Sequence, residues 1–479
     1  MKSLKKNLIY QSAYQLLMVI SPLITFPYIA RTLGNEMYGI YSYYYSIAYY
    51  FGIFTILGLA NYGNRTIAKV RSAGIEKLSK TFFEMMLMQV GMLILVSILY
   101  FASLPFWGGE YKLTAVIEWL YIISVGFDIS WFYFGIEEFK ITTQRSFVAK
   151  IAIIACILIF VKSPSDLNKY TIIMAGGMLI SSLILWIQLP KYIKTNVRSD
   201  NILHHLKPNL VLFVPVLSLV LFNYTDKIML GTMSTWKELG YYTNSDNMVN
   251  VPMGLINGLG VVMLPRISAL SVSNNTNKIE KYVNTSIILS LWAGIALCFG
   301  IKAINADFIP FFFGEGYTRC AELLEWLSIV IVIKAISNVL RTQYLIPMEK
   351  DREFNISVII AAIVNVILNY ILIPMYGAMG AVIATLVAET IVLILYGMFS
   401  KCVIDFGKVF LPGILFIVAG ALMNVAVDTV KDTIMNNSLF VRLVIEVCIG
   451  GIIYCILTLA GILLIKKFTH KLPLNTFSV

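Results

Sequence analysis

Apolar stretches of about twenty residues recur along the whole chain and are separated by short polar segments. Each stretch is long enough to cross a hydrocarbon core of roughly 30 Å as a single helix. About fourteen can be counted, centred near residues 20, 50, 92, 126, 154, 180, 220, 254, 292, 333, 364, 388, 419 and 453. The eighth is rich in Asn and Gly and is the least regular. The pattern predicts an all-α, polytopic membrane protein.

The composition supports a membrane protein and narrows its chemistry. Hydrophobic residues make up 58% of the chain, charged residues only 13%, and the mean hydropathy is +0.80. The six cysteines show no C-x-x-C pairing, and the three histidines lie beside basic residues at expected helix ends, so we expect neither disulfides nor a metal or other cofactor. No linker is long enough for a soluble domain. We therefore expect the function to take place within the membrane, and we do not expect an enzyme.

Basic residues are unevenly distributed between the loops. The clusters at 65–80, 191–207 and 466–471 each follow an even-numbered span, so most Lys and Arg lie on one side of the membrane. By the positive-inside rule that side is the cytoplasm, which predicts a multi-pass membrane protein with both termini cytoplasmic. This topology and the attraction of membrane lipid headgroups explain the net charge of +11, with no need for nucleic acid.

An internal repeat divides the chain. The sequence LGNEMYGIY at 33–41 returns as LGTMSTWKELGYY at 230–242. Beyond the loop, one offset of 201 residues superposes Gly39 on Gly240, Tyr41 on Tyr242 and Arg65 on Arg266. Such duplications are common in transporters, whose substrate sites lie between the repeats. We expect six-helix bundles over 1–200 and 201–403, followed by two further helices and a cytoplasmic tail over 404–479.

A polar stripe follows the second predicted helix and its repeat. Seven tyrosines occur between residues 38 and 50, and on a helix four of them share one face: Tyr38, Tyr41, Tyr45 and Tyr49. The equivalent helix carries Tyr242, Asp246, Asn250 and Asn257. Lipid cannot satisfy such rows, so we expect them to face protein or water, where tyrosine rings and hydroxyls suit sugars. An interfacial aromatic belt is the alternative.

A second polar stripe lies on the tenth predicted span, where Lys334, Asn338 and Arg341 share one helical face. A lysine near mid-span costs about 2.5–3.5 kcal/mol unless it faces a cavity or a partner. We predict that these residues face the transport cavity. A structural salt bridge from Lys334 to Glu84, Asp128, Asp226 or Glu389 is the alternative.

Other charged residues lie at span ends or within spans. Arg31, Arg65 and Arg266 are at span ends, where cations commonly snorkel to headgroups, although the repeat relation between the last two also favours a cavity role. Four carboxylates are candidates for coupling to a proton or Na⁺, and nothing in the sequence selects among them: Glu84, Asp128, Asp226 and Asp246.

Three stretches resemble one family of transporters. They are NLIYQSAYQLLMVISPLITFPYIARTLGNEMYGIYSY at 7–43, WFYFGIEEFK at 131–140 and NYILIPMYGAMGAVIATLVAE at 369–389. Their order along the chain is similar to that in the bacterial polysaccharide-repeat-unit flippases, which transport units of O-antigen, capsule or exopolysaccharide. These belong to the multidrug, oligosaccharidyl-lipid and polysaccharide exporter superfamily.

The resemblance implies two six-helix bundles related by pseudo-twofold symmetry, two extra C-terminal helices and alternating access. The implied substrate is a polyprenyl-pyrophosphate-linked oligosaccharide, which is moved from the cytoplasmic to the outer leaflet of the bacterial cell membrane. The implied partners are a polysaccharide polymerase and chain-length machinery. Related peptidoglycan-precursor flippases carry basic residues that correspond to Arg65 and Arg266. Three alternatives remain open. They are a peptidoglycan-precursor flippase, a multidrug or cation antiporter of the same superfamily, and a membrane glycosyltransferase or polymerase.

Overall fold

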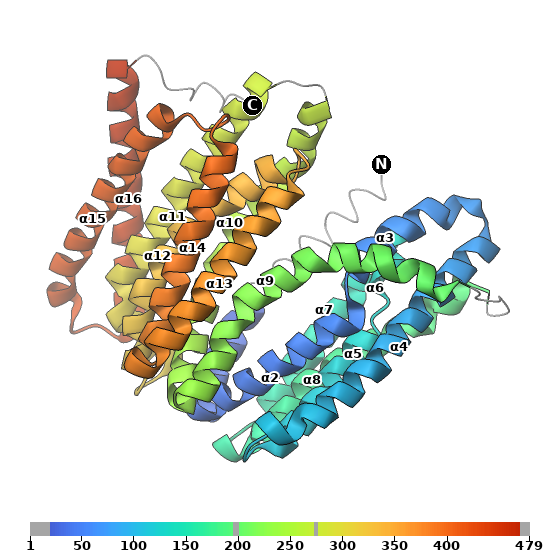
Figure 1. The fold of residues 1–479 in the computed structure, drawn as a ribbon. Helices are drawn as coiled ribbons and strands as arrows, with labels where there is room; N and C mark the ends of the chain where they lie inside the picture. Colours follow the sequence, from blue (N-terminus) through green and yellow to red (C-terminus); the bar gives the residue numbers. More distant parts are fainter. Residues whose placement is uncertain (1–19, 195–200, 273–275, 470–479) are drawn as a thin grey trace. The chain divides into compact units, whose positions relative to one another are not determined.

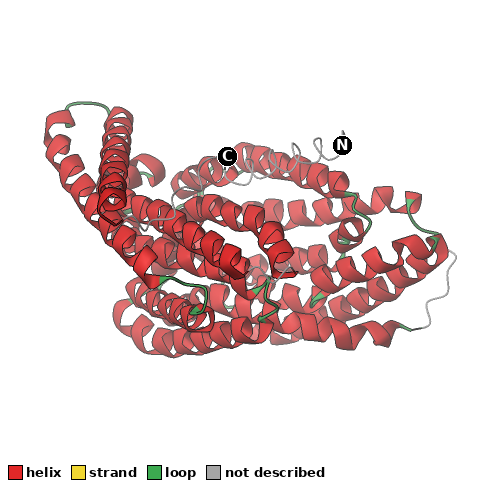
Figure 2. Ribbon diagram, turned by 90° about the horizontal axis from the view of Figure 1, so that it is seen from above, coloured by secondary structure: helices red, strands yellow, loops and turns green. Residues whose placement is uncertain are grey.

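The computed structural model describes residues 20–194, 201–272 and 276–469, which form helices and no strands (Figures 1 and 2). The chain forms two compact units, Met1–Gly240 and Tyr241–Val479. After a helix over 20–32, unit 1 contains α2 Asn35–Ile56, α3 Leu59–Val70, α4 Ile75–Trp107, α5 Lys112–Gly126, α6 Ser130–Gly135, α7 Phe139–Phe160, α8 Leu167–Gln188 and α9 Leu206–Met233. Short 3-10 helices lie at Arg71–Ala73, Pro164–Asp166, Leu189–Lys191 and Ile202–His205.

Unit 2 contains most of α10, Trp236–Val272, which starts in unit 1. It continues with α11 Thr276–Phe313, α12 Thr318–Leu340, the π-helix η5 Arg341–Leu345, α13 Asp351–Tyr376, α14 Ala378–Ser400, α15 Phe406–Ile434 and α16 Leu439–Thr469. The predicted domain boundary after residue 200 stays a prediction. In the structure α9 contacts α2 and α3 and therefore belongs to unit 1.

The predicted fold class is confirmed. Within the described residues, eleven helical segments are long and apolar enough to cross a membrane, and every predicted span centre lies in a helix. The count of fourteen is consistent with these segments together with the helix over 20–32, the α2–α3 pair and α10. The helix over 20–32 is short within the described residues. The helices α2 and α10 carry the polar stripes, which lower their hydropathy.

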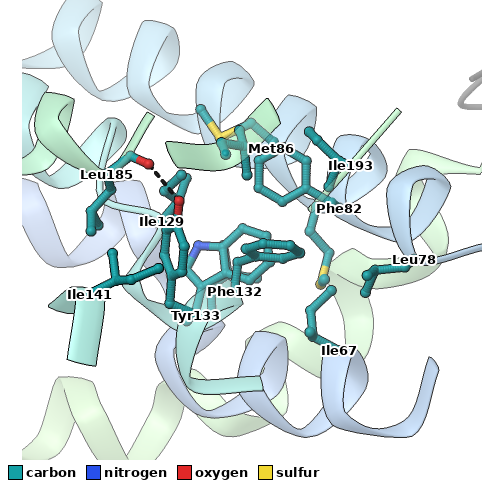
Figure 3. Close-up of a cluster of buried hydrophobic side chains, with 14 of the residues drawn as sticks. Ile67, Leu78, Phe82, Met86, Ile129, Phe132, Tyr133, Ile141, Leu185 and Ile193 are labelled. Carbon is teal, nitrogen blue, oxygen red and sulfur yellow. Dashed lines mark hydrogen bonds between the residues drawn. The ribbon is translucent and has the colours of Figure 1, made fainter. Parts of the chain in front are cut away.

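A buried aromatic cluster holds the break between α5 and α6 in unit 1 (Figure 3). Phe82 stacks on Trp131 with ring centroids 5.6 Å apart, and the Tyr133 hydroxyl donates to the Leu185 carbonyl at 2.6 Å. The break frees backbone carbonyls that lipid could not satisfy. Gln89 of α4 compensates by donating to the carbonyls of Val125 and Asp128, and its amide oxygen accepts from the Trp131 indole.

Two glycines of the repeat allow a close backbone contact within unit 1. A Cβ on Gly39 would lie 2.1 Å from the Trp236 carbonyl oxygen, and a Cβ on Gly240 would lie 2.1 Å from the Asn35 carbonyl oxygen. The offset of 201 relates Asn35 to Trp236 as it relates the two glycines, so the contact is reciprocal. The Asn35 side-chain amide adds a hydrogen bond to the Lys237 carbonyl at 2.6 Å. The repeat landmarks thus mark a helix contact that only glycine permits.

We predict that Gly39→Ala and Gly240→Ala each destabilise the protein, because an added methyl would push two backbones apart at a cost of about 1–3 kcal/mol. Gly91→Ala in α4 is the matched control, since a Cβ there meets no atom within 4 Å. Thermal unfolding of the purified protein in detergent measures the effect. Equal melting temperatures for Gly39→Ala and Gly91→Ala would show that the close contact is not required.

Candidate functional site

The predicted tyrosine stripe forms a continuous row of rings on α2. We call Tyr38, Tyr41, Tyr45 and Tyr49 the tyrosine row. Successive ring centroids are 6.1, 5.7 and 6.0 Å apart, and the first two pairs are stacked. Tyr38 and Tyr41 are buried, whereas Tyr45 and Tyr49 are partly exposed. The period of the helix therefore creates a ladder of ring faces and hydroxyls.

Rings from three other helices of unit 1 pack against the tyrosine row. Tyr170 of α8 meets Tyr41 edge-on at 4.7 Å, and Tyr121 of α5 contacts both Tyr45 and Tyr49. Tyr224 of α9 stacks on Tyr49 with centroids 4.1 Å apart. The row thus packs against other rings of unit 1, and its role as a wall of the transport cavity stays a prediction. Sequence reasoning missed Tyr121, Tyr170 and Tyr224 because their helices bring them to α2 only in the folded chain.

The other tyrosines of the dense stretch have packing roles. Tyr44 donates a hydrogen bond to the Gly108 carbonyl at 2.7 Å, and the Tyr43 ring meets the Trp236 ring edge-on at 5.3 Å. The Tyr50 hydroxyl lies 2.5 Å from the Thr225 hydroxyl of α9. The helix therefore uses tyrosine on several faces, and only one face forms the row.

A buried carboxyl group, that of Glu118, interacts with the tyrosine row and with the rings packed against it. Glu118 of α5 has no exposed surface, and neither of its oxygens has a hydrogen-bond partner among the described residues. It is close enough to interact electrostatically with the hydroxyls of five tyrosines, namely Tyr41, Tyr45, Tyr100, Tyr121 and Tyr170. Sequence reasoning missed Glu118, although a lone carboxylate within an apolar run was a usable signal.

The second predicted stripe forms a charged cluster in unit 2. Lys334 Nζ lies 3.1 Å from Glu389 Oε1 of α14, and the glutamate side chain is 5% exposed against 23% for the lysine. Of the four carboxylates considered as partners of Lys334, Glu389 is the one that the structure places beside it. The lysine is therefore paired and also reaches partly exposed space, so its role toward a substrate stays a prediction.

Asn338 and Arg341 extend this cluster by one helical turn. Arg341 Nη2 donates to Asn338 Oδ1 at 2.9 Å, and Arg341 begins η5 at the point where α12 widens into a π-helix. π-Bulges are frequent at functional sites because they redirect side chains within a helix. With both cations and the carboxylate ionised, the cluster of Lys334, Arg341 and Glu389 carries one excess positive charge.

The α10 residues predicted to line the cavity differ in their surroundings. Tyr242 is buried, and its hydroxyl lies 3.2 Å from the Thr385 hydroxyl of α14. Asp246 is half-buried, whereas Asn250 and Asn257 are exposed. Arg266 is exposed, and its guanidinium carbon lies 4.6 Å from the ring centroid of Tyr282. These positions stay candidates.

The span-end arginines of unit 1 are both exposed. Arg65 lies on α3, which is amphipathic and buries Leu59, Gly63 and Ile67. No hydrogen bond or ion pair to another residue of the described ranges holds Arg65. Arg31 lies near the end of the helix over 20–32. An exposed cation on a helix that packs by its opposite face is available to phosphate, whether from a headgroup or from a substrate.

The structure shows the surroundings of two candidate coupling carboxylates, Glu84 and Asp128. Glu84 is buried, lies 3.2 Å from His205 Nε2, and accepts from the Asn201 amide; the other ring nitrogen of His205 is 2.8 Å from the Tyr62 hydroxyl. Asp128 accepts hydrogen bonds from Ser130 and lies 3.5 Å from Arg145. Both carboxylates stay candidates for ion coupling.

Asp226, a third candidate, is buried in α9. Its neighbour Lys227 directs its ammonium toward the Tyr224 ring at 5.7 Å. Adjacent residues on a helix point in different directions, so Asp226 and Lys227 contact different surroundings. Like Asp246, Asp226 stays a candidate for ion coupling.

Comparison with solved structures shows that the fold is one already known. The chain superposes on the lipid II flippase MurJ in an inward closed conformation with a TM-score of 0.70 and 17% identity, covering 94% of this chain and 97% of that one. It also superposes on an inward-facing multidrug resistance MATE family transporter of the MOP superfamily, with a TM-score of 0.62 and 13% identity over 82% of this chain and 98% of that one. At these identities the likeness concerns the fold alone.

Comparison of sequences identifies the family. The chain is 26% identical to a putative O-antigen transporter of Escherichia coli (strain K12) over 413 residues, which are 83% of this chain and 97% of that protein. It is 24% identical to a putative O-antigen transporter of Shigella dysenteriae over 400 residues, 82% and 98% of the two chains. The family described as "Polysaccharide biosynthesis protein" matches residues 4–271, more than half of the sequence. The resemblance found in the sequence is confirmed, and the chain belongs to this polysaccharide biosynthesis protein family.

Proposed function

We propose that this protein is a flippase that moves polyprenyl-pyrophosphate-linked oligosaccharides from the cytoplasmic to the outer leaflet by alternating access. Membership of the polysaccharide biosynthesis family is the observation that carries the proposal. Two relatives are named as putative O-antigen transporters. Their names support a cell-surface polysaccharide as the polymer that is built from the transported units. A polymerase and chain-length machinery would act on the translocated units.

The chemistry of each unit supports this substrate. Sugars bind to aromatic faces and to hydroxyl groups, and the tyrosine row of unit 1 offers both. A pyrophosphate requires cations, and unit 2 supplies Lys334 and Arg341, whose charges exceed that of Glu389. An antiporter for amphipathic cations would favour the opposite balance, with carboxylates in excess.

Deletion of the gene in its native host tests the proposal. We expect polyprenyl-pyrophosphate-linked oligosaccharide to accumulate in the membrane fraction, where mass spectrometry of extracted lipids identifies it, and expression of the intact chain to remove it. A deletion strain that accumulates no such lipid but becomes sensitive to cationic drugs would refute the proposal and favour an antiporter.

The proposed direction requires the α3–α4 connection to lie in the cytoplasm. Ser72 and Glu110 are both exposed and flank the two ends of α4, a helix of 33 residues that spans about 50 Å. In a variant without native cysteines, Glu110→Cys should react with a membrane-impermeant maleimide added to intact cells, and Ser72→Cys should react only after lysis. The reverse result would invert the orientation.

We predict that charge at position 334 decides activity. Lys334→Arg should retain part of the activity, Lys334→Ala should lower it about tenfold or more, equivalent to about 1.4 kcal/mol, and Lys334→Glu should abolish it, because repulsion replaces attraction toward phosphate. Accumulated lipid-linked oligosaccharide in the complemented deletion strain is the measurement.

The exchanged pair Lys334→Glu with Glu389→Lys distinguishes substrate contact from a structural ion pair. It restores opposite charges across the same 3.1 Å contact. If Lys334 meets the substrate, the double variant should recover protein amount but not transport. Full recovery of transport would show that Lys334 acts only by pairing with Glu389.

The partly exposed end of the tyrosine row should contribute to transport through its ring faces. We predict that Tyr45→Ala and Tyr49→Ala lower transport at near-normal protein amount, and that the Phe variants are milder if stacking dominates. Tyr370→Ala on α13 is the control, because this tyrosine is 69% exposed. A parallel loss of protein amount and activity in the row variants would favour a packing role.

A further inference from the structure

Glu118 is the least compensated charge-bearing group in the interior of unit 1. It lies on the face of α5 that also buries Thr114, Ala115 and Ile122, and its relative exposure is 0%. Both carboxyl oxygens lack a hydrogen-bond partner among the described residues. An ionised carboxylate in such a place would lose its hydration and gain nothing in return, which costs several kcal/mol or more.

Among the described residues, no cation compensates this carboxyl group. α5 packs against α2, α4 and α8, and the groups that face Glu118 from these helices are tyrosines: Tyr41 and Tyr45 from α2, Tyr100 from α4 and Tyr170 from α8. Tyr121 faces it from α5 itself. Lys169, the neighbour of Tyr170 in the chain, is paired with Asp166 at 2.7 Å. Within the ranges that the structure describes, no other charged group acts on the Glu118 carboxyl.

A metal cation is a poor fit to this site. Na⁺ requires several oxygen ligands in direct contact, as other hard cations do. The Tyr100 hydroxyl already donates to the Ala115 carbonyl at 2.6 Å. In the described part of the chain, no group of three or more Asp, Glu, His or Cys side chains that could hold a metal ion includes Glu118. A proton needs no cage of ligands, because it neutralises the carboxyl group directly.

We propose that Glu118 is a proton-binding site, protonated in this conformation and releasing its proton to water when the transport cycle exposes it. Protonation and release interconvert the carboxylic acid and the carboxylate with one proton exchanged. Glu118 interacts electrostatically with Tyr41 and Tyr45, so its charge acts on the rings proposed to contact the sugar. The exchange during transport rests on the proposed function, whereas proton binding in this conformation does not.

Infrared spectroscopy of the purified full-length protein in lipid nanodiscs tests proton binding without any substrate. The spectrum near neutral pH should contain a carboxylic acid C=O stretching band that is missing in Glu118→Gln and displaced in Glu118→Asp. Glu110→Gln, at an exposed position, should leave the band unchanged. Glutamine has the shape and neutral charge of the protonated acid, so Glu118→Gln should fold and melt as the wild type does.

Three results would overturn the proposal. Identical spectra for wild type and Glu118→Gln would show that Glu118 is ionised. Loss of the band on replacing K⁺ by Na⁺ at constant pH would assign the site to Na⁺. In the complemented deletion strain, Glu118→Gln should clear the accumulated lipid-linked oligosaccharide at least about tenfold less well than wild type, and full activity would exclude proton exchange. If the deletion strain accumulates no such lipid while the band persists, the proposed function fails and proton binding stands.

Discussion

The bilayer offers no hydrogen-bond partner, and this constraint governs where every polar group of the chain can lie. A helix that breaks must have its free carbonyls satisfied by protein, which is the role of Gln89 at the α5–α6 break. A helix that carries hydroxyls must turn them toward other helices, as the tyrosine row does. Positions that violate this rule are therefore informative, because the protein retains them at a cost.

The constraint explains why the sequence predicted so much of the fold. Span length and hydropathy alone predicted the span centres, and the structure has a helix at each of them. The stripes on α2 and α12 follow from the period of a helix. The repeat offset of 201 even identified Gly39 and Gly240, whose close contact confirms that these landmarks are structural. Local pattern was sufficient here because each membrane helix must satisfy its own backbone.

Partners across helices could not be predicted in the same way. The sequence offered four carboxylates as possible partners of Lys334. The packing of α12 against α14 in the structure selects Glu389. Tyr121, Tyr170 and Tyr224 were missed because a single tyrosine in an apolar run shows no period. Glu118 was missed even though a lone carboxylate in an apolar run is itself a signal, and the structure adds that it is buried with no hydrogen-bond partner among the described residues.

The two units carry carboxyl groups in opposite electrostatic settings despite the duplication. Glu389 in unit 2 lies beside Lys334, so ionisation of both is mutually favourable, and protonating the glutamate would leave the lysine uncompensated. Glu118 in unit 1 is buried and has no hydrogen-bond partner or cation beside it among the described residues, so the neutral acid is the less costly form. The proposed function and the proposed proton site together assign one task to each unit. Lys334 and Arg341 of unit 2 would meet the phosphates, and Glu118 of unit 1 would exchange the proton.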